Sequence, residues 1–399
     1  MAIEIPFETV ASTANVLTDG LEPALPAEIE LYDNTLREGE QPPGVLFRPD
    51  EKLAIAQALD RMGVHWANVG FPAVSREELA AVREVTSAGL RMRTAALARM
   101  LPADIDVAVE SGVDLISLFV GSSDVHLQHK LRLSESQVIE RTHALVGHAR
   151  SSGKLVAFCL EDGSRTPYDR IVRMFEAAQD AGATYAVLAD TVGVLTPFAS
   201  FELGRRLSAA LRIPLGVHFH DDLGLALANT VGALQGGARM AHVTVNGVGE
   251  RSGNACLEEL AVLLRVKFGR TLGLELGELH ALSGLVHAAS GTRPPEHKAV
   301  TGRWCFTHES GIHVAGLLAH RETYQPYPPS LVGRAHEIVF GKHTGTHSVA
   351  YLAARHGIDL DADACARVLA RIKSHGKSEG SAIPDDLVLT WVRSETRRA

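Results

Sequence analysis

Two histidines one residue apart stand at the end of a short apolar run, in the stretch GVHFHDDLG (residues 216–224). Side chains at positions i and i+2 of a β-strand point to the same face, so His218 and His220 can converge on one point. Two imidazoles and one carboxylate leave coordination positions open for a divalent cation, such as Mg²⁺, Mn²⁺ or Zn²⁺, that acts as a Lewis acid. Taken alone, however, an HxH pattern is more often an ordinary pair of core or surface histidines, so the rest of the chain must decide.

Polar residues of catalytic or ligating types also follow most of the remaining predicted strands. In chain order they are Asp33, Arg37, Glu38 and Gln41; Arg99; Ser122 and Ser123; Glu161 and Asp162; Asp190 and Thr191; and Asn246, Glu250, Arg251 and Asn254. A purely structural role would scatter such residues over both ends of the strands, so their clustering favours a metal site. The carboxylate that joins the histidines could be Asp33, Glu38, Asp221 or Asp222. Arg37 could neutralise an oxyanion that develops on the substrate, and it could also form a salt bridge to a neighbouring acid.

Eight short apolar or β-branched runs must position these residues. They are EIELYD (28–33), WANVGF (66–71), RMRTAAL (91–97), DLISLFV (114–120), KLVAFCL (154–160), TYAVLAD (184–190), PLGVHFH (214–220) and HVTVNG (242–247). Several intervening stretches have apolar residues at i, i+3, i+4 spacing and end in glycine, which is typical of helices. Repeated βα units imply parallel strands, and eight of them predict a (β/α)8 TIM barrel with its chemistry at the C-terminal ends of the strands. A doubly wound open sheet is the alternative, but the GxGxxG turn expected after its first strand is missing.

The predicted domains are an N-terminal arm (residues 1–27), the catalytic barrel (28–275) and a C-terminal, mostly helical region (276–399). The net charge of −8 argues against binding to nucleic acid or to an anionic membrane. Four scattered cysteines form no CxxC pair, which suits reduced thiols in a cytoplasm. No signal peptide and no apolar run of about 18 residues is present. We therefore expect a cytoplasmic protein without a membrane span.

With these residues assembled, the chain resembles the DRE-type metallolyase barrel family, in the branch of homocitrate, isopropylmalate and citramalate synthases. The motifs that carry the resemblance are DNTLREGEQ, SSDVHLQHKLR, EDGSRT, DTVGVLTPF, HFHDDLGLALANT, NGVGERSGNACLEEL, THESGIH and FGKHTGTHS. They span roughly residues 30–350, in the order that the family has them. The arrangement is most similar to the short homocitrate synthases.

The resemblance implies roles for individual residues. The acidic residue directly after the arginine binds the metal in this family, which selects Glu38 to join His218 and His220, and Asn254 matches the residue that completes the site. Arg37 corresponds to the catalytic arginine. His313 matches a histidine implicated in proton transfer that a neighbouring subunit's C-terminal region contributes, so a homodimer is implied. Catalytic and substrate-pocket positions are further expected at Glu161, Gln41, Arg99, Thr191 and Asn68.

The implied reaction is a Claisen-type condensation of acetyl-CoA with a 2-oxo acid, followed by hydrolysis of the thioester. Asn68 stands where family members commonly have a glutamate, and the loss of that charge could admit a more anionic oxo acid or change the activity. The candidate acids therefore include 2-oxoglutarate, phosphonopyruvate, oxaloacetate, pyruvate and 2-oxoisovalerate. A lyase that runs the reverse reaction, as hydroxymethylglutaryl-CoA lyases do, and a non-catalytic metal- or CoA-binding relative are the alternatives.

Overall fold

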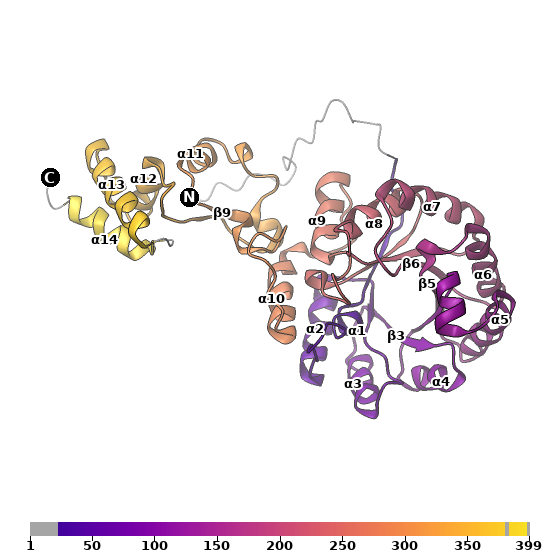
Figure 1. The fold of residues 1–399 in the computed structure, drawn as a ribbon. Helices are drawn as coiled ribbons and strands as arrows, with labels where there is room; N and C mark the ends of the chain where they lie inside the picture. Colours follow the sequence, from indigo (N-terminus) through magenta and orange to yellow (C-terminus); the bar gives the residue numbers. More distant parts are fainter. Residues whose placement is uncertain (1–22, 380–382, 397–399) are drawn as a thin grey trace. The chain divides into compact units, whose positions relative to one another are not determined.

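The computed structural model describes residues 23–379 and 383–396 of the chain. Eight parallel strands form a closed barrel in which each strand pairs with the next and β8 pairs with β1. The strands are β1 (Glu30–Asp33), β2 (Trp66–Asn68), β3 (Arg93–Arg99), β4 (Leu115–Gly121), β5 (Leu155–Glu161), β6 (Tyr185–Asp190), β7 (Leu215–Phe219) and β8 (Met240–Val243). Figure 1 shows the strands inside a ring of helices. The (β/α)8 barrel predicted from the sequence is confirmed.

Helices follow the strands, and all of them except the one-turn helix α1 cover the outside of the barrel. They are α1 (Thr35–Glu38), α2 (Pro49–Met62), α3 (Arg76–Thr86), α4 (Pro102–Glu110), α5 (Glu135–Ser151), α6 (Tyr168–Asp180), α7 (Pro197–Ala210), α8 (Ala226–Gln235) and α9 (Leu257–Phe268). Their starts follow ordinary capping chemistry: the Ser75 hydroxyl accepts the Glu78 N–H at α3, and Ser134 forms a capping box with Gln137 at α5. Helix α6 buries Ile171 and Phe175, one turn apart, on its inward face.

The eighth strand ends earlier than the sequence indicates. Residues 242–247 were predicted as strand, but β8 stops at Val243 and a short 3-10 helix, η4 (Val245–Gly247), follows. Asn246 takes a left-handed conformation there with φ 60°, which asparagine tolerates better than most residues. The turn aims the loop that follows β8 back across the end of the barrel, where Asn254 forms a backbone bridge to His220.

Large side chains fill the interior of the barrel. Tyr32, Trp66, Leu115 and Met240, from four different strands, pack together there with smaller residues. Such layers make a barrel interior a packed core rather than a channel. This core closes the barrel interior, so residues that contact a ligand at the end of the barrel must lie at the strand ends and in the loops that follow them.

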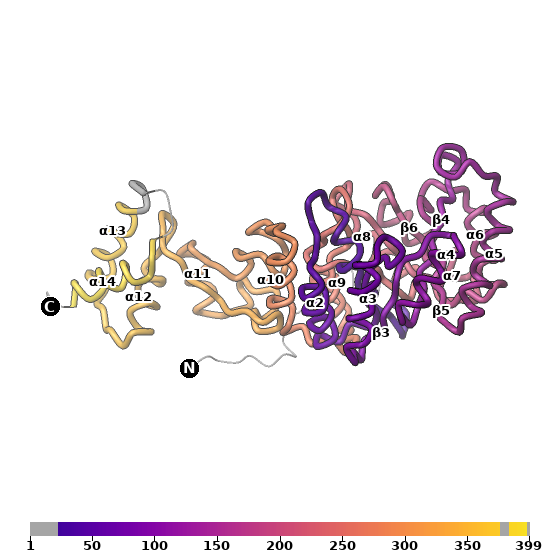
Figure 2. The backbone as a smooth tube through the Cα atoms, turned by 90° about the horizontal axis from the view of Figure 1, so that it is seen from below, coloured from indigo at the N-terminus to yellow at the C-terminus, as the bar shows by residue number. Residues whose placement is uncertain are grey.

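The chain divides into two compact units after Pro294. Helix α10 (Leu279–Ser290) belongs to the barrel unit because it packs against α2, beside which it lies in Figures 1 and 2. The sequence-based boundary at residue 276 stays a prediction. Of the predicted N-terminal arm, residues 1–22 lie outside the described part of the chain.

The C-terminal unit has its own core. It contains β9 (Thr307–His308), β10 (Glu337–Ile338), α11 (Gly311–Ala319), α12 (Thr346–Arg355), α13 (Ala362–Glu379) and α14 (Asp385–Thr396). Apolar residues of its helices, including Leu352, Val368 and Val392, are buried against one another. In the described part of the chain, every helix is too short or too polar to cross a membrane.

Candidate metal and active site

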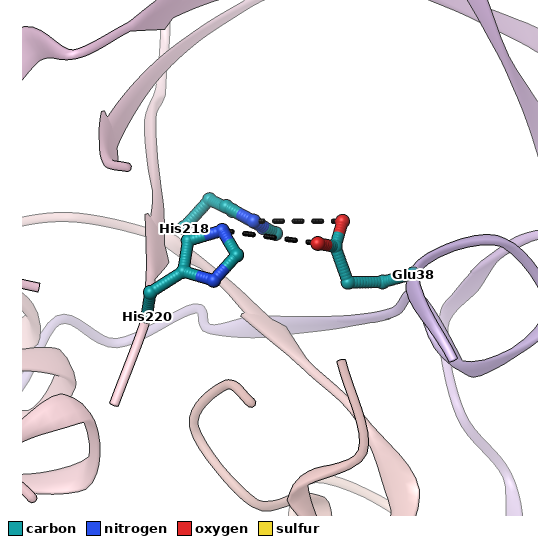
Figure 3. Close-up of side chains that lie close together, drawn as sticks. All are labelled: Glu38, His218 and His220. Atoms are coloured by element: carbon teal, nitrogen blue, oxygen red, sulfur yellow. Dashed lines mark ion pairs between the residues drawn. The ribbon is translucent and has the colours of Figure 1, made fainter. Parts of the chain in front are cut away.

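Three buried side chains converge at the C-terminal end of the barrel, as Figure 3 shows: Glu38, His218 and His220. Glu38 Oε2 lies 3.9 Å from His218 Nε2, and Glu38 Oε1 lies 3.8 Å from His220 Nε2. One ligand atom from each residue falls within 4.8 Å of the others. Two imidazole nitrogens and a carboxylate at these separations can surround one divalent cation. The prediction that the HxH pair points to one side of its strand agrees with this geometry.

Glu38 reaches the site because β1 runs directly into the one-turn helix α1. The buried Asp33 carboxylate accepts hydrogen bonds from the Thr35 backbone N–H at 2.8 Å and from the Thr35 hydroxyl at 3.0 Å. The Thr35 hydroxyl oxygen in turn accepts the Val245 N–H at 2.8 Å, which ties α1 to the end of β8. These bonds use the Asp33 carboxylate to shape the turn. Asp33 is therefore a structural residue, and Glu38 is the carboxylate beside the histidines.

The carboxylates of the other two acidic candidates interact with partners other than the two histidines. Asp221 Oδ1 accepts the Ala226 N–H at 2.8 Å, at the start of α8. Asp222 forms a two-point ion pair with Arg251, at 2.8 and 2.9 Å. Within the part of the chain that the structure describes, Glu38 is the carboxylate that joins the two histidines in a possible metal cluster.

Asn254 lies next to the histidines. Its backbone pairs with that of His220, and its Nδ2 lies 3.4 Å from His218 Nε2. Its amide oxygen is buried and has no hydrogen-bond partner among the described residues. A buried oxygen left without a donor is suited to accept a cation. The donor set of one carboxylate, two imidazoles and an amide oxygen thus fits a divalent metal.

Burial keeps both histidines neutral. The pKa of His218 lies well below its usual value, first because burial disfavours the charged ring and then because His220 and Arg37 repel a positive charge. Burial also lowers the pKa of His220, although Glu38 opposes the shift. Only the neutral ring can bind a metal, so both histidines are in the form that can do so at neutral pH.

Arg37 extends over the same carboxylate. Its Nη1 donates to Glu38 Oε2, and its Nη2 donates to Asn34 Oδ1 at 3.1 Å. Its Nε is buried and has no hydrogen-bond partner in the described ranges. A fixed guanidinium with a spare buried donor is suited to stabilise negative charge that develops on a substrate.

A cavity of about 270 Å³ surrounds these groups. Arg37, Glu38, His218 and His220 line it, and so do three of the other predicted site residues, which are Gln41, Glu161 and Thr191. Glu161 is the last residue of β5, where Lys130 Nζ donates to both of its carboxylate oxygens, at 2.6 and 2.5 Å. The Thr191 hydroxyl accepts the Asp162 N–H at 2.8 Å, so this side chain also shapes the loop after β5.

Two predicted substrate-binding residues do not line this cavity. Asn68 is buried, and its Nδ2 donates to Asn34 Oδ1 at 3.3 Å. Arg99 pairs with Asp104 at 2.6 Å and lines a neighbouring cavity instead. A contact of either side chain with the oxo acid therefore has no support from the cavity geometry.

His313 lies in the C-terminal unit, on α11, and its side chain is exposed. Its ring lies against that of Tyr324, with the ring centres 4.3 Å apart. The proton-transfer role that the family resemblance implies for His313 stays a prediction.

Sequence reasoning missed the floor of the cavity. His242 and Ser117 line it from β8 and β4, and His242 is stacked on Tyr32 with ring centres 4.1 Å apart. Burial holds the pKa of His242 well below its usual value, so this ring is neutral too. His242 also packs edge to face against His218, at 5.4 Å between ring centres. The strand period would place every second residue of β8 inside the barrel, but it does not say which inward residue reaches the cavity.

Comparison with known proteins gives consistent results. Residues 28–286 match the HMGL-like family, and residues 300–380 match the homocitrate synthase post-HMGL domain-like family. Homocitrate synthase AksA of Methanopyrus kandleri is 43% identical over 88% of this chain and 89% of its own length. The 2-isopropylmalate synthase of Methanocaldococcus jannaschii is 39% identical over 90% of this chain and 70% of its own length. Among solved structures, the Bacillus subtilis HMG-CoA lyase has a TM-score of 0.61 at 22% identity, over 68% of this chain and 97% of the lyase, a likeness of fold alone.

Proposed function

The chain belongs to the HMGL-like family, and on that premise we propose that it condenses acetyl-CoA, a 2-oxo acid and water into a 2-hydroxy-2-carboxymethyl acid and free CoA. It would thus be an acyltransferase that converts the acyl group into an alkyl group on transfer. The observation that carries the proposal is the convergence of Glu38, His218 and His220 beside Arg37 in one cavity. The synthase names of the relatives support the two substrates.

We propose Glu38, His218 and His220 as the metal ligands, with Asn254 completing the site. When bound, a divalent cation would act as a Lewis acid on the carbonyl of the oxo acid. The neutral state of both imidazoles, which burial enforces, keeps this ligand set ready at neutral pH. Activity of the metal-free protein reloaded with Mg²⁺, Mn²⁺ or Zn²⁺ identifies the ion.

Arg37 would stabilise the oxygen that becomes negatively charged when the new bond forms. Its two terminal nitrogens are held by Glu38 and Asn34, so its position is fixed before the substrate binds. The guanidinium lines the cavity in which the oxyanion would form, and its buried Nε has no partner in the described part of the molecule. Such preorganised donors lower a barrier because they need no rearrangement as the charge develops.

Glu161 is our candidate for the base that takes a proton from the thioester methyl group, because it lines the cavity from the end of β5. His313 is a second proton-transfer candidate by family resemblance. The methyl carbon then forms a bond to C2 of the oxo acid, and the former carbonyl oxygen takes up a proton to become a hydroxyl. Water finally cleaves the carbon–sulfur bond, which leaves a carboxylate on the product and releases the CoA thiol.

For the oxo acid we favour 2-oxoglutarate, whose carboxymethyl adduct is homocitrate, because the relative at 43% identity is a homocitrate synthase. The 2-isopropylmalate synthase is nearly as similar, so a related synthase acting on another oxo acid is the alternative. The test is free-thiol release from acetyl-CoA across 2-oxoglutarate, oxaloacetate, pyruvate, 2-oxoisovalerate and phosphonopyruvate. We expect metal-dependent release with one acid and none with the His218→Ala protein; release that needs no oxo acid would contradict the proposal.

A lyase acting in the reverse direction is less well supported by the structure. The lyases of this family carry a cysteine in a glycine-rich loop near the site, whereas Cys256 of this chain lies one residue before α9 and its thiol donates to Glu258 at 2.8 Å. Cys159 does line the cavity, but burial raises the pKa of its thiol to about 12. A lyase would cleave hydroxymethylglutaryl-CoA without releasing free CoA from acetyl-CoA, so the same assay separates the two functions.

We also propose that the working enzyme is a homodimer in which the C-terminal unit of one chain completes the site of the other. In the barrel unit, the exposed large apolar side chains in the described residues all lie in the segments that follow strands: Leu46, Val74, Leu101, Val125, Val194, Phe198 and Leu223. An apolar rim around an active end is typical of a surface that another polypeptide covers. Mixing a His218→Ala protein with a His313→Ala protein should restore part of the activity through mixed dimers; no recovery after exchange of subunits would contradict this arrangement.

A further inference from the structure

The proposed condensation places negative charge on two oxygens in turn, first on the thioester oxygen and then on the oxygen of the oxo acid. Loss of a methyl proton to Glu161 leaves an enolate, whose charge lies largely on the thioester oxygen. Arg37 lies beside Glu38, where we place it to stabilise the second oxygen. Arg251, which also lines the cavity, forms a two-point ion pair with Asp222. The enolate therefore needs a further donor close to Glu161.

Lys130 is the cation in direct contact with Glu161. Its Nζ donates to both carboxylate oxygens, at 2.6 and 2.5 Å, which uses two of its three N–H bonds. Among the described residues, no acceptor lies within hydrogen-bond distance of the third. The ammonium also lies 5.9 Å from the centre of the Phe119 ring, and both Phe119 and Glu161 line the metal cavity. Lys130 thus has a spare donor at the edge of the space in which the thioester must react.

The backbone fixes where this ammonium lies. Lys130 belongs to a π-helix, η2 (His126–Leu131), that follows β4. Leu127 anchors the segment, because it is buried at 7% exposure. Gly121 lets the segment approach the end of β4, since a Cβ there would lie 2.7 Å from the Cβ of His126. Because π-helical turns occur frequently at functional sites, this anchored, tightly packed turn is a suitable support for a catalytic group.

We propose that Lys130 is a further catalytic residue, whose ammonium donates a hydrogen bond to the thioester oxygen while Glu161 takes the methyl proton. This role rests on the proposed function. The methyl carbon and the oxygen are bonded to the same thioester carbon, so a carboxylate and an ammonium in direct contact can reach both at once. The C–H bond breaks, and its electron pair forms the carbon–carbon double bond of the enolate. The carbonyl electron pair moves to the oxygen, and the proton ends on Glu161.

The balance of charge favours this pairing. Before the proton moves, the ammonium faces the charge of Glu161; afterwards Glu161 is neutral and the same charge lies on the enolate oxygen. The ammonium of Lys130 therefore has one anionic partner at each stage and stays protonated throughout. When the methylene carbon attacks C2 of the oxo acid, the electron pair returns and the thioester carbonyl is restored. A donor already in place needs no rearrangement as the charge develops, and its hydrogen bond strengthens when the acceptor is ionised.

Lys130→Met and Lys130→Arg test the role of the ammonium, and Lys154→Met is the matched control. Lys154 directly precedes β5, at the opposite end of the strand from Glu161. The Lys130 side chain is 45% exposed, so its replacement should leave the fold intact. Each metal-loaded protein is assayed for kcat, for KM and for the isotope effect on kcat with acetyl-CoA deuterated at the methyl group. Calorimetry measures the binding of CoA and of carboxymethyl-CoA, a thioether whose carboxylate takes the place of the enolate.

We expect Lys130→Met to lower kcat about 100-fold, the usual cost of removing one donor to a developing oxyanion. Its KM for acetyl-CoA and its affinity for CoA should change by less than about threefold, because the lost interaction forms only as the charge develops. The isotope effect on kcat should rise, since proton transfer becomes the slow step. Carboxymethyl-CoA should bind about tenfold more weakly, because its carboxylate loses a charged donor. Lys130→Arg, which keeps a cation, should recover part of kcat, and Lys154→Met should match the unaltered protein throughout.

Other outcomes overturn the inference in distinguishable ways. If Lys130→Met lowers kcat less than about threefold and leaves the isotope effect unchanged, the ion pair with Glu161 is only structural. If the same variant weakens CoA and carboxymethyl-CoA equally, Lys130 binds the acyl donor without acting on the enolate. In both cases thiol release by the unaltered protein still supports the condensation, so the proposed function stands. If the unaltered protein releases no thiol with any oxo acid, the proposed function fails and the role of Lys130 fails with it.

Discussion

Gly249 lies against the proposed metal site so closely that a single added methyl group should displace Asn254, a proposed ligand. A Cβ at this position would lie 1.9 Å from Asn254 Oδ1 and 3.2 Å from Glu38 Cγ. Non-bonded contacts of this kind are not found below 3.0 Å, so in Gly249→Ala the amide must move by more than 1 Å. The displaced atom is the end of a side chain, so the fold can adjust at a cost of about 1–3 kcal/mol. The ligand geometry cannot adjust in the same way.

We therefore expect Gly249→Ala to weaken metal binding about 10- to 100-fold, the usual cost of disturbing a group that orients a metal site. The contact with Glu38 Cγ requires a shift of only a few tenths of an ångström, and neither histidine is among the three nearest atoms, so binding should be weakened and not abolished. The dissociation constant for Mn²⁺, measured by calorimetry on the metal-free protein, reports the effect. Gly284→Ala, on α10 with open space around its added Cβ, is the matched control and should bind Mn²⁺ normally.

A double-mutant cycle tests the mechanism as well as the magnitude. If the new methyl group acts by pushing Asn254, then Gly249→Ala should have little further effect in an Asn254→Ala background, because the clash is gone. Additive losses in the double mutant, or an unchanged Mn²⁺ affinity in Gly249→Ala, would refute the placement of Asn254 at the metal.

Three further predictions concern the metal, a buried ion pair and the pH dependence of stability. Chelation with EDTA should abolish thiol release, and Mn²⁺ should restore it. The His218→Ala protein should lose at least about 100-fold in kcat/KM and gain nothing from added metal. Full activity in EDTA would contradict a metal-dependent reaction. Lys52→Met should lower the free energy of unfolding, measured by urea titration, by about 3 kcal/mol. Lys52 is 1% exposed and its ammonium pairs with two glutamates at 2.7 and 2.6 Å, so its loss leaves both carboxylates without their cation. A change in the free energy of unfolding below about 1 kcal/mol would count against this prediction. The metal-free protein should lose stability as the pH falls from about 7 to about 5, because the three buried site imidazoles, whose pKa values burial lowers, stay neutral while the unfolded chain binds protons. Burial raises the pKa of Asp33 to about 7, so the folded state takes up one proton over the same pH range, which partly offsets the effect of the three imidazoles. The net result is still a loss of stability. A stability that rose on acidification would contradict the assignment of neutral, buried imidazoles.

The barrel was predictable because its signal is repeated eight times. Apolar runs and amphipathic stretches alternate along the chain, and the short HVTVNG run still marked the place of β8 although the strand ends at Val243. The exact end was not predictable, because it depends on the left-handed turn at Asn246, and asparagine also occurs in many other conformations. Local pattern thus predicted the elements, and backbone geometry at single residues decided their ends.

The candidate metal ligands were predictable in part. The i, i+2 spacing placed His218 and His220 on one face of a strand, but four acids were equally placed to join them. Asp33 is excluded only by its hydrogen bonds to Thr35, and Asp222 only by its ion pair with Arg251. Such side-chain pairings, whether local as at Thr35 or between distant loops as at Arg251, leave no periodic trace in the sequence, so family resemblance had to select Glu38.

The positions of His242 and Arg99 relative to the metal cavity were not predictable from the strand pattern. His242 lies on an inward-facing position of β8, where the strand period allows either a packed core residue or a cavity wall. Arg99 follows a strand like the other candidates, yet its ion pair with Asp104 holds it at the neighbouring cavity. The direction of a side chain at a strand end depends on the loops that surround it, so it cannot be predicted from the residue and its place in the strand alone.

The most direct test of the central claim follows the acetyl carbons themselves. Acetyl-CoA labelled with ¹³C at the methyl carbon is incubated with the protein, a divalent metal and 2-oxoglutarate, or the acid selected by the thiol-release panel, and the products are identified by NMR. The condensation predicts that the label appears as a methylene bonded to a carbon that carries a hydroxyl and a carboxylate. If the label appears only in acetate, the protein hydrolyses the thioester without forming a carbon–carbon bond, and the proposed function is wrong.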